Sequence, residues 1–187
     1  MDKIMSEVCV FLADGFEEIE ALTVVDLLRR AKVYVDTVSI TDDYTVRGAH
    51  GIPVQTEDLI TEIDFKESDM IVLPGGMPGT TNLKEDENVR RAVQEAYDDG
   101  RYVAAICAAP TILADMGLLK GKRATCYPDM ESEIEDAYLT GAPVATDENI
   151  ITSQGVGTAI DFALKLIEVL ISEEKAVEIA DSIVYQR

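Results

Sequence analysis

Short, almost wholly apolar runs recur along this chain, and segments with helical spacing of their apolar residues lie between them. The clearest runs are residues 8–13, 70–73 and 102–106. A strand that is apolar at nearly every position is buried on both faces, as in a parallel sheet covered by helices. This alternation predicts an α/β fold, with helices on both sides of a mostly parallel sheet.

The remaining elements follow from periodicity and from turn residues. We expect helices at 17–30, 86–99, 110–116, 159–171 and 173–180, strands at 33–40, 123–126 and 149–152, and a loop or hairpin at 45–56. The chain contains no internal repeat, linker or low-complexity tract. It is therefore expected to form one domain over residues 1–187.

Composition excludes several classes of protein. With 16 basic and 36 acidic residues, the formal charge of −20 disfavours binding to nucleic acid or to anionic membranes. There is no apolar run of membrane-spanning length and no basic segment leading into an apolar one, so we expect a soluble cytoplasmic protein. The three cysteines are an odd number without metal-site spacing, which favours reduced thiols and predicts no metal site.

Cys107 stands where the apolar run 102–106 ends and Pro110 opens a helix. A thiol at such a strand-to-helix turn lies beside free amides at the positive end of the helix dipole, which favour the reactive thiolate. The alternative is a small buried hydrophobe, the commonest role of a free cysteine. The position at the turn favours the interpretation of Cys107 as a nucleophile.

Two further features accompany this cysteine. Gly75 and Gly76 follow the run 70–73, so their amides can act as oxyanion-type donors. Among the acidic residues that open the first helix, Glu17 and Glu18 are explained by the helix dipole. Glu20 has a different spacing and could point toward the strand ends, where a like-charged thiolate would raise its pKa and keep it protonated.

Other residues are weaker candidates. Cys126 could act as a resolving or auxiliary thiol, although its position favours an inert packing role, and Cys9 lies within an apolar strand. Arg47 could bind an anion or be a solvated cation. His50, between two glycines, is expected in a surface loop.

Four segments, in this order and spacing, resemble the DJ-1/ThiJ/PfpI superfamily and most of all its short DJ-1-like branch. They are 13–20 (ADGFEEIE), 73–76 (LPGG), 105–110 (AICAAP) and 152–155 (TSQG). The resemblance implies a flavodoxin-like three-layer sandwich, similar to class I glutamine amidotransferases, and a homodimer. It also implies that Cys107 is an oxidisable nucleophile, Glu20 its protonated partner, and Gly76 and Ala108 the oxyanion-type donors.

Two departures from the family pattern narrow the chemistry. The protease-like branch has histidine directly after its cysteine, whereas this chain has Ala108, which disfavours a peptidase. Where several DJ-1-like proteins have a histidine near the nucleophile, this chain has Tyr127. Tyrosine can donate a hydrogen bond but is a poor base at neutral pH, which argues against glyoxalase chemistry that depends on that histidine.

Three functions remain as hypotheses. The leading one is a cofactor-independent enzyme of glyoxalase or deglycase type, in which Cys107 attacks a small reactive carbonyl. The second is a redox sensor in which an oxidant converts Cys107 to a sulfinate. The third is a chaperone-like dimer that does not need the thiol.

Overall fold

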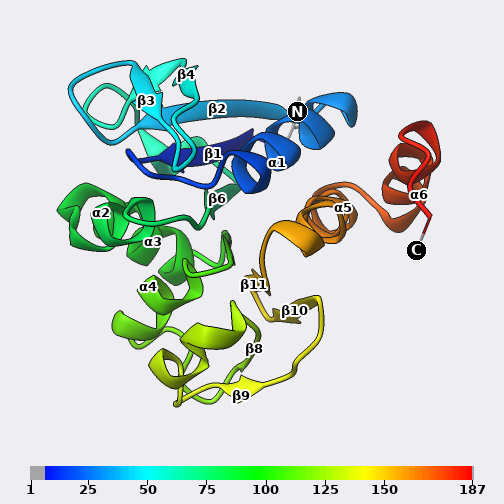
Figure 1. The fold of residues 1–187 in the computed structure, drawn as a ribbon. Helices are drawn as coiled ribbons and strands as arrows, with labels where there is room; N and C mark the ends of the chain where they lie inside the picture. The colour runs from blue at the N-terminus through cyan, green and yellow to red at the C-terminus, as the bar shows by residue number, and fades with distance from the viewer. Residues whose placement is uncertain (1–6, 187) are drawn as a thin grey trace.

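The computed structural model describes residues 7–186, and a seven-stranded sheet forms its centre (Figure 1). The strand order is β10-β11-β7-β6-β1-β2-β5, and every neighbouring pair is parallel except β10 with β11. The strands are β1 (Glu7–Leu12), β2 (Tyr34–Ser39), β5 (Asp58–Leu59), β6 (Met70–Leu73), β7 (Tyr102–Ile106), β10 (Val144–Asp147) and β11 (Ile150–Ser153). The expected mostly parallel sheet is confirmed.

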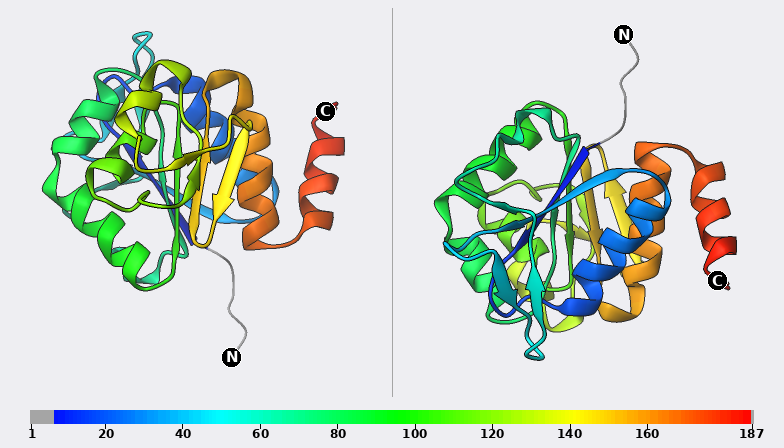
Figure 2. Two further views of the ribbon diagram at one scale, coloured as in Figure 1. Left: turned by 90° about the horizontal axis from the view of Figure 1, so that it is seen from below. Right: turned by 90° about the horizontal axis from the view of Figure 1, so that it is seen from above.

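Helices cover both faces of this sheet. The helices are α1 (Glu18–Arg30), α2 (Gly79–Glu85), α3 (Glu87–Asp98), α4 (Pro110–Asp115), α5 (Ala159–Leu170) and α6 (Glu173–Ser182). Figure 2 shows α2, α3 and α4 on one side of the sheet, α1 and α5 on the other, and α6 outside α5. The three-layer α/β sandwich is thus confirmed.

The apolar strands serve two separate cores, because successive side chains of a strand point to opposite faces. In β1, Val8 and Val10 join the core beneath α1 and α5, whereas Cys9 and Phe11 join the core beneath α3 and α4. All four side chains are fully buried. This double burial explains why the strand has no polar face.

Two small sheets lie outside the central one. The expected hairpin forms from β3 (Thr45–Arg47) and β4 (Pro53–Gln55), which pair antiparallel. The strand expected at 123–126 is shorter: β8 (Arg123–Ala124) pairs with β9 (Tyr138–Leu139) and not with the central sheet. Three 3-10 helices complete the structure: η1 (Phe65–Glu67), η2 (Pro128–Glu133) and η3 (Val156–Thr158).

Helix α2 and strand β10 are among the elements that were not predicted from the sequence. Helix α2 contains Gly79, Thr80 and Thr81, which are poor helix formers, and it is anchored by Leu83, which is fully buried in the core. Strand β10 folds back on β11 through a turn in which Glu148 has a φ of 50°. Both elements depend on tertiary packing more than on local propensity.

The arrangement of strands places four loops at one edge of the sheet. Strands β1, β6, β7 and β11 are neighbours and run in the same direction, so the loops that follow them lie together. The chain leaves β1 toward β2 and later returns to β6 on the other side of β1. Ligands of open α/β sheets bind at such a reversal of strand order. None of the helices within 7–186 is long and apolar enough to cross a bilayer.

Candidate active site

Cys107 lies directly after β7 in a backbone conformation that is uncommon for a side-chain-bearing residue. Its φ is 65°. Two backbone hydrogen bonds hold it there: its amide donates to Ser153 O at 3.0 Å, and its carbonyl accepts from the Tyr127 amide at 2.8 Å. The end of β11 and the loop after β8 therefore fix the turn that presents the thiol, which is half-buried.

The Gly75-Gly76 loop after β6 interlocks with the loop between β1 and α1. The carbonyl of Gly75 accepts from the Glu17 amide at 2.8 Å, and the amide of Gly75 donates to Glu20 Oε2 at 2.9 Å. Gly76 has a φ of 89°, a region that favours glycine. The two loops therefore hold each other in place at the edge of the sheet.

The backbone amides of Gly76 and Ala108 both donate hydrogen bonds to the sulfur of Cys107. Such donors stabilise negative charge on the sulfur, or on an oxygen attached to the carbon that it attacks. The structure thus brings together Cys107, Gly76 and Ala108, the three groups that the sequence assigned to this role.

Glu20 lies in the first turn of α1 and is fully buried. Its Oε2 accepts from Gly75, whereas its Oε1 has no hydrogen-bond partner within the described part of the chain. A Cβ placed on Gly155 would lie 3.8 Å from this Oε1 and 3.9 Å from Cys107 Sγ. This carboxyl oxygen and the sulfur therefore both lie within 4 Å of the same point.

Burial controls the protonation of this pair. It raises the pKa of Glu20 to about 7, against the opposing effects of the Cys107 thiol and the Gly75 amide. Burial, and after it the charge of Glu20, raises the pKa of Cys107 to about 12, although the amides of Ala108 and Gly76 lower it. The amides at the turn favour the thiolate, but burial and the charge of Glu20 outweigh their effect on the pKa of Cys107.

A cavity of about 520 Å³ opens onto the two groups. Glu17, Gly76, Tyr127 and residues 154–158 line it together with Glu20 and Cys107. Of these cavity residues, only Gln154 and Gly155 belong to a family motif named above, and the helix dipole alone accounts for Glu17 at the level of sequence. Their role as cavity walls depends on η3 and α1 meeting across the sheet edge.

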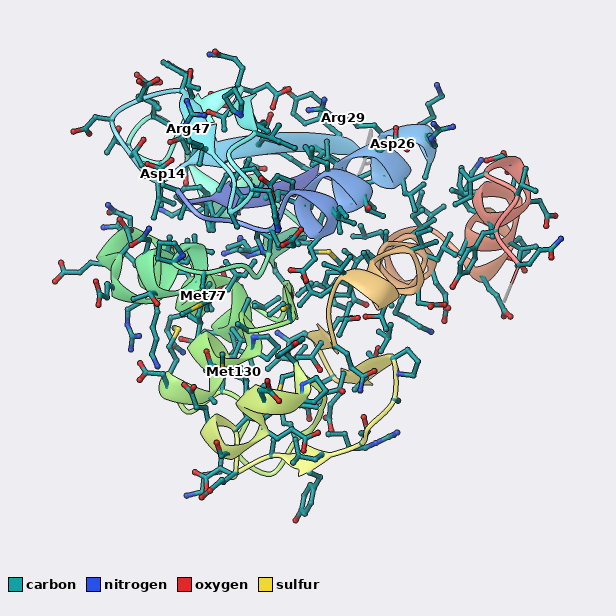
Figure 3. All side chains as sticks on the ribbon, viewed as in Figure 1. Asp14, Asp26, Arg29, Arg47, Met77 and Met130 are labelled. Atoms are coloured by element: carbon teal, nitrogen blue, oxygen red, sulfur yellow. The ribbon has the colours of Figure 1, made fainter. Side chains whose placement is uncertain are left out.

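Three of the weaker candidates lie elsewhere. Arg47, in the β3–β4 hairpin, donates from Nη1 to Gly51 O at 2.7 Å, and its amide donates to Asp14 Oδ1 at 2.8 Å (Figure 3). It does not line the Cys107 cavity. Cys126 is buried, with its sulfur 3.3 Å from Tyr127 O, and it does not line the cavity either.

His50 lies at the surface, as expected, but it contacts the start of α1. Its amide and its Nδ1 each lie 2.8 Å from the carboxylate of Glu18, and Nδ1 lies 3.6 Å from Glu17 Oε2. The hydrogen bond with Glu18 raises the pKa of His50. An ion pair therefore accounts for this arrangement.

Two groups among residues 7–186 hold possible metal-ligating atoms within 4.8 Å of one another. They are Glu17 with Glu18 and His50, and Glu7 with Cys9 and Asp36. Neither group contains Cys107 or Glu20.

We expect Gly76→Ala to destabilise the fold strongly. A Cβ at this position would lie 2.4 Å from Glu17 N and 2.6 Å from Gly15 O, which are backbone atoms, and φ is positive. The loss should be about 3 kcal/mol or more, measured by urea unfolding. The control is Gly100→Ala, where φ is 73° but no heavy atom lies within 4 Å, and we expect about 1–2 kcal/mol. Equal losses in the two variants would contradict the interlocked loops.

Comparison with known proteins places this site in a family. The sequence model of the DJ-1/PfpI family matches residues 6–169. The chain is 38% identical over 186 residues to Protein DJ-1 homolog B of Arabidopsis thaliana, which covers 98% of this chain but only 42% of that protein. It is 34% identical to the glutathione-independent glyoxalase DJ-1 of Schizosaccharomyces pombe, covering 91% of this chain and 94% of the relative.

A solved structure shows the same fold. The crystal structure of Drosophila melanogaster DJ-1beta matches with a TM-score of 0.94 and 33% identity, covering 98% of this chain and all of the other. The match extends over the central sheet and both helical layers described above. With a family model spanning most of its length, this chain belongs to the DJ-1/PfpI family.

Proposed function

We propose that this protein converts small 2-oxoaldehydes such as methylglyoxal to 2-hydroxycarboxylates without a cofactor, with Cys107 as nucleophile. The observation that carries this proposal is the fully buried Glu20 carboxyl beside the Cys107 sulfur, at the cavity that both residues line. A relative of this chain bears the name of a glutathione-independent glyoxalase, which supports the same reaction class.

The reactive form of the pair carries its single proton on Glu20. Between the two ionisations the pair holds one proton, and its transfer from sulfur to carboxyl yields a thiolate beside a neutral acid. The thiolate attacks the aldehyde carbon and forms a C–S bond. The carbonyl oxygen becomes an alkoxide, which the Gly76 and Ala108 amides stabilise until Glu20 donates its proton to it.

Glu20 then acts as a base on the resulting hemithioacetal. Its carboxylate takes the proton from the former aldehyde carbon, the electron pair forms an enediol, and a proton returns to the neighbouring carbon. The product is a thioester of a 2-hydroxyacid. Water hydrolyses it to the free acid and regenerates the thiol, so one carbon is oxidised, its neighbour is reduced and no external redox partner is needed.

Tyr127 can assist this sequence only as a hydrogen-bond donor. It lines the cavity, and its ring carbon Cδ2 would lie 3.6 Å from a Cβ on Gly155. Because a phenol is a poor base at neutral pH, proton abstraction falls to Glu20, whose pKa of about 7 suits a base that works near neutrality.

The direct test is product formation by the purified protein. Methylglyoxal should be converted to lactate over many turnovers per chain, in buffer without glutathione, as measured by chromatography of the reaction mixture. Lactate formation no faster than in buffer alone, or only after addition of glutathione, would contradict the proposal.

We also propose that the chain forms a homodimer through α1. Ile19, Leu22 and Ile52 are exposed by 53%, 38% and 52%, and they line one groove of about 590 Å³ along this helix. Neighbouring apolar side chains exposed together mark interaction surfaces, and a two-fold interface would bury the same patch on both copies.

Leu22→Glu is therefore expected to shift the protein to monomers. Sedimentation velocity should report a dimer for the wild type and a monomer for this variant, because a charge in an apolar interface has no partner. The control is Val177→Glu, since Val177 is 54% exposed on α6 but does not line the groove. A monomeric wild type, or dissociation by both variants, would contradict this interface.

A further inference from the structure

A second cavity, of about 530 Å³, adjoins the two backbone segments that contain Gly76 and Cys107. Gly76 and Cys107 line the Cys107 cavity, whereas the next residues, Met77 and Ala108, line the second one. We call it the α2–α4 cavity, because α2, α3, α4 and η2 supply most of its walls. The proposed carbonyl chemistry does not use it.

Thr80 lines this cavity and carries a hydroxyl group that is not satisfied within the protein. The residue is only 4% exposed, and its hydroxyl has no hydrogen-bond partner among residues 7–186. Thr111, which lines the same cavity, donates its hydroxyl to Ala108 O at 2.8 Å. A buried hydroxyl without a partner is costly, and an acceptor on a ligand would remove that cost.

Two cations share one carboxylate in the same wall. Arg90 Nη1 lies 2.7 Å and Lys84 Nζ 3.3 Å from the oxygens of Asp115. Arg90 uses Nη1 again for Lys84 O, at 3.3 Å, and no described residue bonds to its Nε or Nη2. That edge of the guanidinium has the geometry that binds a carboxylate.

The rest of the lining is apolar or exposed. Met77 lies just before α2 and Met130 lies within η2, and the two side chains give the cavity an adaptable apolar wall (Figure 3). Glu85 and Glu133 also line the cavity, but both are exposed, so solvent screens their charges more than those of the half-buried Lys84 and Arg90.

We propose that the α2–α4 cavity binds a short-chain organic carboxylate. The ligand's oxygens accept hydrogen bonds from Arg90 and from the hydroxyl of Thr80, and its hydrocarbon stem packs against Met77 and Met130. A charged head and an apolar stem match the two kinds of wall that the cavity presents.

The test is a titration of the full-length protein with butanoate, followed by the NMR shifts of backbone amides. Saturable shifts are expected at Thr80, Lys84, Ala108 and Thr111. Butanamide, which has the same shape without the charge, should bind about tenfold more weakly or worse.

Matched variants separate binding from folding. Arg90→Gln should weaken butanoate binding by about tenfold or more, and Arg91→Gln, an exposed cation on the same helix, should not. Thr80→Val should weaken it roughly 3–10-fold, whereas Thr80→Ser retains the hydroxyl and should restore it.

Three results would overturn the proposal. One is the absence of saturable shifts at the four amides. Another is butanamide binding as tightly as butanoate. The third is saturation that moves only the amides of Tyr127 and Gly155, because these residues line the Cys107 cavity instead.

Discussion

Cys107→Ser is expected to lower kcat/KM for methylglyoxal by about 10³-fold or more, to the level of the reaction in buffer. Cysteine is intrinsically a strong nucleophile through its thiolate, and serine needs a stronger base than the carboxyl that this site provides. The Gly76 and Ala108 amides remain in the variant, but without a nucleophile no hemithioacetal forms for them to stabilise. The measurement is lactate formation at equal protein concentrations.

The matched control is Cys126→Ser. Cys126 is also a free cysteine, but it is buried away from the cavity, and a serine can keep the hydrogen bond to Tyr127 O. Its kcat/KM should stay within about threefold of the wild type, given an unchanged circular dichroism spectrum. Equal losses in both variants would show that the proposed nucleophile is wrong.

Glu20→Gln is expected to stabilise the fold at pH 8 while it lowers activity. The folded pKa of about 7 lies above the ordinary value of 4.5, so the folded protein holds this proton more tightly than the unfolded chain does. Stability is therefore lost as the pH rises from about 4.5 to 7, and the full cost of the buried charge is present above that range. Glutamine carries no charge, so the variant lacks this destabilisation of the folded state, which is on the order of 3 kcal/mol at pH 8.

Thermal unfolding checks this prediction. The melting temperature of Glu20→Gln should exceed that of the wild type by roughly 6–12 °C at pH 8, and the gap should close toward pH 4.5. The control is Glu95→Gln, an exposed position on α3, which should change little at either pH. A gap that grows as the pH falls would contradict the raised pKa of Glu20.

Glu20→Gln also tests the proposed roles of the Glu20 carboxyl as proton donor and as base. In the wild type kcat/KM should rise with pH through about 7 and then level off, because the singly protonated pair is the reactive form. In Glu20→Gln this inflection should disappear and kcat should fall by about 10²–10⁴-fold, the usual contribution of a general acid or base. Thiolate absorbance should appear at lower pH than in the wild type, since the charge that opposes ionisation of Cys107 is gone.

Much of the fold could be predicted from local patterns. Strands β6 and β7 fall on the runs 70–73 and 102–106, because burial on both faces requires apolar residues at every position. Helix α2 was missed because its glycine and threonines have low helix propensity, and burial of Leu83 compensates for them.

The candidate site likewise has features that could be predicted from the sequence and features that could not. The strand-to-helix turn at Cys107 and the Gly75-Gly76 loop are each encoded within a few residues. Arg47, near Asp14 and Gly51, shows the limit of such inference, because its contacts arise from the docking of the β3–β4 hairpin on the loop after β1.

The sequence by itself determined the parallel α/β sandwich, the cysteine at a strand end and the amides beside it, because these depend on local conformation and on which residues avoid water. Only the tertiary structure decided the ionisation of Cys107 and Glu20. The sequence-based reasoning attributed a raised pKa of Glu20 to a neighbouring thiolate, whereas burial is its main cause. Burial is set by elements distant in the chain, so protonation at this site is a property of the whole fold.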